Sequence, residues 1–554
     1  MMTAGRKNFL SVRAHFAKTC REENDECYAT KPMPGDKTPL PATTQALFQD
    51  WHLAGLLDQA AGVHPERLFL VGAKTLTYGE AASQTRRIAA WLQNQGVNCG
   101  DRVIILTMNR PEVALLAFGV GRLGAIFVII NNAIKSYGLK QILAQCEPSV
   151  VVLDETTLAL ADDIAGARIV FVGESKPAAA QFSFNEIIQT PDPGPQRFPG
   201  IDLDPVSLIF TSGSTGKPRG VALSHDNIRF VVAAIQERLQ YRPDDQIGVF
   251  LPLSFDYGLY QIFLAAQAGA SLFVGRPEMI GPEILKILAT QEISVLPGVP
   301  TLFAAMLKML ERGPHALPHL RAVTNTGDKL PRAYIEQLLK FFPSLRVFSM
   351  YGLTECKRVS ILLPEEMAER PGSVGRPLAG TEVYVIDEEG RRLPPGEIGE
   401  LVIRGRHVAL GYWQEEEETR QRYRCDIRTG RRELHSGDSC SVDAGGYLYF
   451  QGRKDTLLKH RGFRISPLEI EEAACAIPGV SEAGVVKSDD ADRLHLFVSV
   501  KDKDLTPAQV LAELQKRLEP VKIPDRVHII AELPKTANRK VDRKLLKARL
   551  TAPV

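Results

Sequence analysis

The amino-acid sequence predicts an α/β fold: a large N-terminal domain of layered parallel sheets with a β-rich subdomain, followed by a small α+β C-terminal domain. Two patterns support this prediction. From about residue 45, apolar strand-like runs alternate with helical segments, and from about residue 380 short strands are separated by turns. The 554 residues also exceed the roughly 250–300 at which one hydrophobic core stops growing, so more than one domain is expected.

The first alternation of helix and strand begins at residue 77. Thr77 and Glu80 form a capping-box pattern that predicts the start of a helix, and Gly96 marks its end. The run DRVIILTM at 101–108 then reads as a buried strand. The same alternation recurs through 111–154, so parallel strands covered on both faces are expected. A proline-rich, polar segment at 173–205 leads to the next strand.

The later part of the chain predicts a β-rich subdomain and then a separate domain. The runs EVYVID, LVIRG and GGYLYFQG have strand composition and are separated by turn residues. After GRKDT a mixed pattern of about one hundred residues is long enough for a small domain. We therefore divide the chain into an N-terminal extension at 1–44, an N-terminal domain at 45–454 and a C-terminal domain at 455–554.

Composition indicates a globular protein, and its overall charge does not favour any class of binding partner, so partners have to be inferred from local sites. Hydrophobic residues make up 44%, charged residues 24%, and the net charge of +2 gives no general attraction to nucleic acid or anionic membranes. The eight cysteines form no C-x-x-C pair, which argues against zinc or a disulfide framework and favours the cytoplasm. The apolar stretch at 113–130 contains Arg122 and three glycines, so we expect a buried helix and strand rather than a membrane span.

The N-terminal extension leaves its role open. Residues 1–21 contain five basic residues and no acidic residue. That composition is typical of an organelle transit peptide, but also of a disordered leader or an expression remnant. Targeting to an organelle is therefore the alternative to a cytoplasmic location.

The segment LIFTSGSTGKPRGV at 208–221 has the composition of a phosphate-binding loop. Gly213 and Gly216 leave room for a ligand beside the backbone, and hydroxyl groups and cations surround them. The P-loop NTPase motif would need Gly at 211 and Ser or Thr at 218, where this chain has Thr211 and Pro218. The candidate phosphate ligands are Thr211, Ser212, Gly213, Ser214, Thr215, Gly216 and Lys217.

Several motifs occur together in one order along the chain. They are TSGSTGKPRG at 211–220, YGLTE at 351–355, HSGD with GGYLYFQGRKD within 435–455, HRGFRISPLEIEE at 460–472 and PKTANRKVDRKLL at 534–546. In this order they resemble the motifs of the adenylate-forming (AMP-binding) superfamily of acyl-CoA synthetases, amino-acid adenylation domains and luciferases. The resemblance extends from about residue 45 to residue 550.

The resemblance implies a site for ATP and Mg²⁺. Residues 211–217 would hold the β- and γ-phosphates, Thr354 would hydrogen-bond the α-phosphate, and Glu355 would supply a hard oxygen ligand to Mg²⁺. Adenine would stack on Tyr351 beside Gly352, with Gly327 and Asp328 lining its pocket. Asp438 would accept hydrogen bonds from the ribose, and Arg453 would make a second ribose contact.

The C-terminal motifs imply a catalytic cation and a hinge. Lys540 would stabilise the charge that develops when a carboxylate attacks a phosphoryl centre. Asp455 would be the hinge about which the mobile C-terminal domain rotates. Two positions depart from the family pattern, because Arg219 and Arg539 stand where Lys and Gly are common.

The motif LPLSFDYGLYQ resembles the acid-binding pocket of amino-acid adenylation domains. Asp256 follows Phe255, at the position where an aspartate would bind the substrate's α-amino group. Alternatively, Asp256 caps a helix that starts near Tyr257 and touches no ligand. An amino acid and a simple acyl or aryl acid therefore both remain open as substrates.

Taken together, the sequence predicts an ATP-dependent ligase of natural product biosynthesis that joins a carboxylic acid to a thiol through an acyl-adenylate. The acceptor would be coenzyme A or the phosphopantetheine arm of a carrier protein. A stand-alone amino-acid adenylating enzyme that loads a carrier protein is the alternative. Two readings of a different class are a luciferase-like oxygenase and a non-catalytic nucleotide-binding protein.

Overall fold

The structure is a computed structural model. It describes residues 51–212, 218–313, 316–426, 429–453, 458–460, 463–488, 493–501, 504–518, 520–536 and 541–551. These residues belong to one compact unit that begins at Trp51. The predicted N-terminal extension at 1–44 lies outside them.

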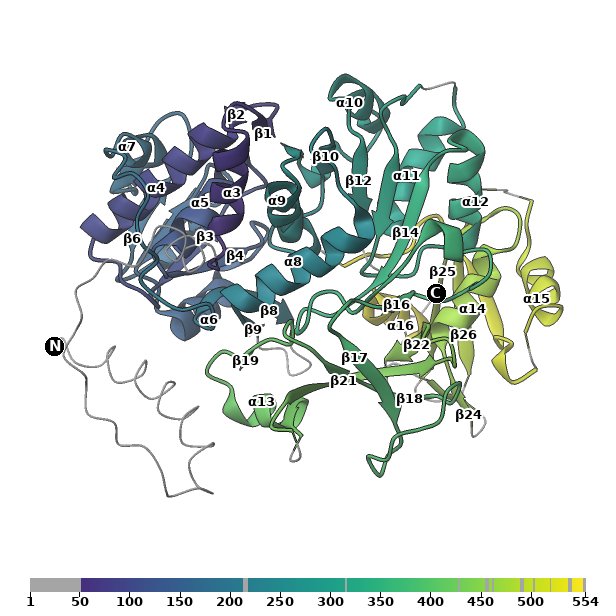
Figure 1. Cartoon of the computed structure of the whole chain (residues 1–554). Helices are drawn as coiled ribbons and strands as arrows, with labels where there is room; N and C mark the ends of the chain where they lie inside the picture. Colours follow the sequence, from purple (N-terminus) through teal and green to yellow (C-terminus); the bar gives the residue numbers. More distant parts are fainter. Residues whose placement is uncertain are drawn as a thin grey trace, which may run out of the picture. The chain divides into compact units, whose positions relative to one another are not determined.

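The first part of the chain forms two large sheets whose central strands are parallel (Figure 1). The nine-stranded sheet runs parallel from β14 to β1 and adds antiparallel strands at both edges. In spatial order its strands are β16 (Arg376–Pro377), β15 (Ser360–Leu362), β14 (Arg346–Tyr351), β13 (Ala322–Asn325), β12 (Val295–Gly298), β10 (Gln246–Val249), β11 (Ser271–Val274), β1 (Leu68–Val71) and β2 (Leu76–Thr77).

The eight-stranded sheet carries the candidate phosphate loop. Its strands are β19 (Gly411–Tyr412), β9 (Pro218–Ser224), β8 (Pro205–Ser212), β4 (Ile126–Ile130), β3 (Arg102–Leu106), β5 (Val150–Leu153), β6 (Arg168–Phe171) and β7 (Phe182–Ser183). Strands β8 to β7 are paired in parallel, whereas β9 pairs antiparallel with β8 and leads the chain back from the loop. The fully apolar pattern of β4 and β5 follows from burial on both faces.

Helices cover these sheets as the alternating pattern predicts. They are α3 (Gly55–Val63), α4 (Tyr78–Asn94), α5 (Pro111–Arg122), α6 (Ser136–Cys146), α7 (Phe184–Ile188), α8 (His225–Leu239), α9 (Asp256–Ala268), α10 (Ile284–Thr290), α11 (Pro300–Leu310) and α12 (Arg332–Phe341). The capping box is confirmed, because Thr77 and Glu80 each accept a hydrogen bond from the other's backbone N–H. One hydrophobic core joins both sheets through α5, α8 and α9. Short 3₁₀ helices lie at Leu158–Asp163, Pro277–Met279 and Pro364–Glu366.

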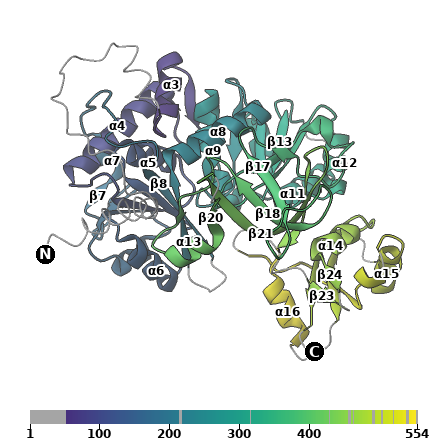
Figure 2. The same cartoon turned by 60° about the horizontal axis from the view of Figure 1, so that its bottom comes forward.

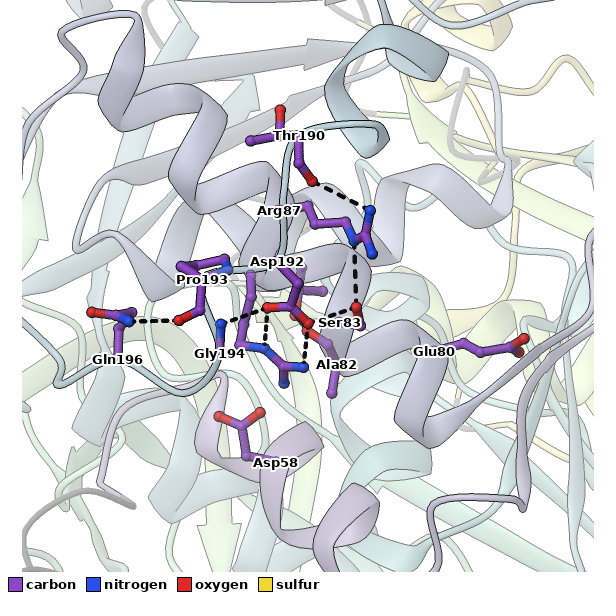
Figure 3. A network of polar contacts seen from close by, with 12 residues as sticks. Asp58, Glu80, Ala82, Ser83, Arg87, Thr190, Asp192, Pro193, Gly194 and Gln196 are labelled. Carbon is purple, nitrogen blue, oxygen red and sulfur yellow. Dashed lines mark hydrogen bonds and ion pairs between the residues drawn. The ribbon is translucent and has the colours of Figure 1, made fainter.

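The proline-rich segment that precedes β8 is tied to helix α4 (Figure 3). The Asp192 carboxylate accepts hydrogen bonds from Arg86 Nε at 2.8 Å, Arg86 Nη2 at 2.6 Å and Ser83 Oγ at 2.7 Å. The hydrogen bonds from Arg86 hold the pKa of Asp192 below its ordinary value. Arg87 Nη1 also donates to the Thr190 carbonyl at 3.3 Å. These bonds fix the connection that delivers the chain to β8.

A third sheet forms the predicted β-rich subdomain. It comprises β17 (Glu382–Ile386), β18 (Gly399–Arg404), β21 (Arg432–Val442), β20 (Tyr423–Cys425) and β22 (Leu448–Arg453), with helix α13 (Glu416–Arg422) before β20. All of its pairings are antiparallel. The pairing of β21 with β22 places Asp438 directly opposite Arg453.

The last part of the chain has its own hydrophobic core, built from residues between Leu458 and Leu550. Its elements are β23 (Leu458–His460), β24 (Phe463–Ile465), α14 (Pro467–Cys475), β25 (Val480–Lys487), β26 (Leu494–Val500), α15 (Pro507–Gln515), a 3₁₀ turn (Pro520–Lys522), β27 (Arg526–Ile529) and α16 (Arg543–Thr551) (Figure 2). The α/β fold class is confirmed. Asp455 lies outside the described residues, so the boundary there stays a prediction.

No helix in the described ranges is both long and apolar enough to cross a membrane. The stretch at 113–130 instead forms α5 and β4, which are buried.

Candidate active site

A cavity of about 1300 Å³ lies where the predicted motifs converge. Its lining includes Thr211 from β8, Asp256 from α9, Tyr351 from β14 and Asp438 from β21. Thr211, Tyr351 and Asp438 come from the eight-, nine- and five-stranded sheets, and Asp256 comes from a helix that follows β10. In α/β folds, ligands commonly bind beyond the carboxyl ends of the parallel strands.

The candidate phosphate loop is bracketed by two residues that line the cavity. Thr211 on β8 and Arg219 on β9 are paired directly opposite each other. Ser212 ends β8, and Gly213, Ser214, Thr215, Gly216 and Lys217 lie outside the described residues. The Arg219 guanidinium lies over the Tyr412 ring, 5.7 Å from its centroid. Arg219 thus retains a cation at the cavity where the family pattern has Lys.

Glu355 is a buried carboxylate at the cavity. Its Oε1 accepts a hydrogen bond from the Tyr412 hydroxyl at 2.8 Å, and its backbone carbonyl accepts from Ala409 N. Thr354 precedes it and also lines the cavity. Among the described residues no group of three or more His, Cys, Asp or Glu side chains is arranged to hold a metal ion. The donor set therefore fits a Mg²⁺ that takes one protein carboxylate and its remaining ligands from phosphates and water.

Asp438 is the most enclosed carboxylate of the candidate nucleotide site, with only 3% of its surface exposed. Its Oδ2 accepts a hydrogen bond from the Tyr351 hydroxyl, and its Oδ1 lies 3.3 Å from Arg453 Nε. Burial raises the pKa of Asp438, and the charge of Arg453 opposes that rise. Oδ1 makes no hydrogen bond with the described residues, so a buried acceptor remains available at the cavity.

Tyr351 and Gly352 have definite structural constraints. The Tyr351 ring packs against Phe450 with centroids 5.4 Å apart, and the ring is largely buried. A Cβ atom on Gly352 would lie 1.7 Å from the Lys357 carbonyl oxygen, so only glycine allows this approach of the two backbones. Gly352 therefore fixes the segment that follows the YGLTE motif.

Gly327 and Asp328 follow β13 and line the same cavity. Gly327 has φ of +86°, which favours glycine. Asn325 Nδ2 donates to the Asp328 carbonyl at 2.8 Å, and Asp328 Oδ1 accepts from Lys329 N at 2.9 Å. Gly327 and Asp328 thus line the same cavity as Thr354, Glu355 and Asp438.

Asp256 is the first residue of α9, so the prediction that it caps this helix is wrong, whereas its contact with a ligand stays a prediction. The N-cap is Phe255, and no side chain caps this helix. Asp256 Oδ2 instead accepts a hydrogen bond from Lys357 Nζ at 3.4 Å. Lys357 is 5% exposed, and burial lowers its pKa while Asp256 raises it.

Sequence reasoning missed several charged or polar residues that line the cavity, among them Lys357, Arg358, Tyr412 and Arg422. Lys357 has φ of +64°, a left-handed conformation uncommon for residues other than glycine. The signal was present in the sequence as CKR, two adjacent cations placed between YGLTE and an apolar strand. Tyr412 and Arg422 had no comparable signal, because their position depends on folding of the β-rich part.

Lys540, Arg539 and Asp455 lie outside the described residues. Thr536, earlier in the same motif as Lys540, lines the cavity. The last part of the chain therefore contributes a residue to the site.

Two family profiles match the chain. The profile described as AMP-binding enzyme matches residues 57–413, and the AMP-binding enzyme C-terminal domain matches residues 469–540. The chain belongs to the AMP-binding enzyme family. The superfamily suggested by the sequence motifs is thus confirmed.

Relatives of this AMP-binding enzyme include single ligases and multimodular synthetases. It is 28% identical over 92% of its length to a dimodular nonribosomal peptide synthase of Bacillus subtilis, of which it spans 22%. It is 29% identical over 79% of its length to L-proline–[L-prolyl-carrier protein] ligase of Streptomyces coelicolor, of which it spans 85%.

Among solved structures, the anthranilate CoA ligase AuaEII in complex with anthranoyl-AMP is similar to this chain. The TM-score is 0.84 with 26% sequence identity, and the match covers 92% of this chain and 98% of that one. The relatives include AMP-forming ligases that differ in acid and in acceptor.

Proposed function

We propose that this AMP-binding enzyme is an ATP-dependent acid–thiol ligase. Its strongest support is Asp438, a buried carboxylate at the cavity that retains one oxygen without a hydrogen bond to the described residues. Such an acceptor suits a ribose hydroxyl, and Tyr351 and Arg453 hold the carboxylate in place. Glu355 would hold Mg²⁺, which neutralises phosphate charge when bound.

The first half-reaction forms an acyl-adenylate. A carboxylate oxygen of the substrate bonds to the α-phosphorus of ATP, the bond from that phosphorus to the bridging oxygen breaks, and pyrophosphate leaves. In this proposal residues 211–217 hold the β- and γ-phosphates and Thr354 contacts the α-phosphate. Lys540 stabilises the charge shared by carboxylate and phosphate.

The second half-reaction forms the thioester. The thiol sulfur bonds to the acyl carbon, the bond from that carbon to the phosphate oxygen breaks, and AMP leaves while the thiol proton passes to solvent. Rotation of the C-terminal domain about Asp455 would remove Lys540 and admit the thiol. One cavity would then serve both reactions.

The acid substrate and the thiol acceptor differ among enzymes of this family. Coenzyme A and a carrier protein's phosphopantetheine are both compatible with the relatives, whose names include a CoA ligase and a carrier-protein ligase. Asp256 at the cavity favours a stand-alone amino-acid adenylating enzyme as the alternative, since its carboxylate could bind an α-amino group. We place the reaction in the cytoplasm.

Exchange of labelled pyrophosphate into ATP, screened over amino, aryl and fatty acids, tests the function. Exchange should require the cognate acid and Mg²⁺, and AMP should form with the thiol. Asp438→Asn should weaken exchange, whereas Asp443→Asn is a matched control, because Asp443 follows the same strand outside the cavity and pairs with Arg370.

Two results would overturn the proposal. Release of inorganic phosphate without AMP would contradict adenylation. Acid-dependent oxygen consumption would instead indicate the luciferase-like oxygenase, and nucleotide binding without any exchange would indicate a non-catalytic protein.

A further inference from the structure

The wall of the cavity beside Asp256 carries two adjacent buried cations. Lys357 and Arg358 follow the YGLTE motif, and both line the cavity with 5% and 7% of their surfaces exposed. The close approach of Gly352 to the Lys357 carbonyl and the left-handed conformation of Lys357 fix this segment. The two cations are therefore held in place before any ligand arrives.

Only one of these cations is paired with a carboxylate. Lys357 Nζ lies 3.4 Å from Asp256 Oδ2. Arg358 Nη1 donates to the Thr326 hydroxyl, and its guanidinium lies over the Tyr257 ring at 5.4 Å from the centroid. Arg358 Nε has no hydrogen-bond partner, and no carboxylate of the described residues lies within ion-pair distance of Arg358.

The neighbouring acidic groups are already engaged. Asp256 holds Lys357, and Glu355 accepts a hydrogen bond from Tyr412 and is the Mg²⁺ ligand in the proposed function. The Tyr257 hydroxyl is hydrogen-bonded to Thr324. Asp256 acts on Arg358 through its charge without forming an ion pair with it, and a buried guanidinium that lacks an ion-paired carboxylate is costly, so a ligand anion at this position would lower that cost.

We infer that the acid substrate carries a second carboxylate, away from the reacting one, that pairs with Arg358 in the cavity. This inference rests on the proposed function and names its substrate class as a dicarboxylic acid, with or without an amino group. A guanidinium is suited to this role because its planar fork matches a carboxylate. Arg358 is then a specificity-determining residue, with Lys357 and Asp256 as its neighbours in the pocket.

Matched pairs of acids test the inference by pyrophosphate exchange. Succinate with succinamate, glutarate with glutaramate, aspartate with asparagine and glutamate with glutamine each differ by one carboxylate replaced with a neutral amide. We expect at least one dicarboxylic acid to exceed its amide by about 10- to 100-fold in kcat/KM, the effect of hydrogen bonds to a charged group. Arg358→Met should remove most of that preference, and Arg358→Lys should restore part of it.

Arg370→Met is the matched control, because Arg370 also lies over a tyrosine ring, at 4.5 Å from the Tyr447 centroid, but does not line the cavity. It should leave the preference unchanged. Stabilisation of the wild-type protein against heat by each acid in the presence of ATP gives a second measurement that needs no variant.

The outcomes separate the inference from the proposed function. If aryl or fatty acids that have no second carboxylate support exchange, and dicarboxylic acids do not exceed their amides, the ligase stands and this inference is wrong. Equal losses of acid and amide in Arg358→Met would show that Arg358 binds the reacting carboxylate or supports the fold. If no acid supports exchange or AMP formation, the proposed function itself fails.

Discussion

The nucleotide half and the acid half of the cavity are built in different ways. In the nucleotide half, Asp438, Tyr351 and Arg453 come from separate motifs, each recognisable in the sequence, and meet at hydrogen-bond or ion-pair distance. In the acid half, Asp256 was recognised, but its partner Lys357 and the adjacent Arg358 were not. A nucleotide is the same for every member of the family, whereas the acid differs, so the acid half has to be inferred from contacts in this chain.

The largest expected effect concerns Lys540 in the nucleotide half. Lys540→Ala should slow adenylate formation by about 10²–10³, the usual cost of removing a preorganised charge at a transition state. Thioester formation from a chemically supplied acyl-adenylate should fall far less, because the rotated domain no longer uses this lysine. Rapid-quench assays of the two half-reactions measure the difference.

Arg539→Ala is the control for a general loss of positive charge and should leave adenylation nearly intact. Comparable damage to both half-reactions by Lys540→Ala, or a larger adenylation defect in Arg539→Ala, would show that the wrong cation has been assigned.

The next effect tests whether Asp256 binds substrate or only Lys357. If it binds an α-amino group, Asp256→Ala should cost about 2–4 kcal/mol in kcat/KM for an amino acid, the scale expected when a buried charge loses its partner. The desamino analogue should hardly change. Equal losses for both acids would mean that Asp256 acts through Lys357, 3.4 Å away.

A smaller effect is expected at the ribose position. Asp438→Asn should raise the KM for ATP by roughly 10-fold or more, since a hydrogen bond to a charged group contributes about 1.5–3 kcal/mol. Tyr351→Phe keeps the ring beside Phe450 and removes only the hydroxyl, so its effect should be smaller. Titration of ATP at saturating acid measures both. An unchanged KM in Asp438→Asn would remove the support for the nucleotide site.

The smallest expected effect is a pH dependence of the KM for the acid that the KM for ATP does not share. Burial lowers the pKa of Lys357 below its ordinary value of 10.5, while the negative charges of Asp256, Glu355 and Cys356 oppose that lowering. As pH rises through that pKa, the acid pocket loses a positive charge, so the KM for an acidic substrate should rise while the KM for ATP stays constant. Steady-state kinetics of both substrates across the alkaline range test this, and Lys357→Met should abolish the rise. A parallel rise for ATP would contradict an effect confined to the acid half.

Much of the fold was predictable because each of its signals is local. The capping box at Thr77 and Glu80, the buried strand runs and the order of the motifs depend on residues close together in the chain. The alternative interpretation of Asp256 places the helix start one residue later, with Asp256 as its cap, whereas the helix begins at Asp256. That alternative fails because a lysine 101 positions away in the sequence holds the carboxylate, although a polar residue at a helix start usually caps it.

The sequence by itself determined the α/β layers, the family of motifs and most of the candidate nucleotide residues, because periodicity and motif spacing are properties of the chain. Only the tertiary structure decided which charges meet. Strand pairing places Asp438 opposite Arg453. The close contact between Gly352 and Lys357 holds Lys357 and Arg358 in the wall of a buried pocket. Pairing and burial both depend on packing between distant segments, and the electrostatics of a site follow from burial rather than from residue type alone.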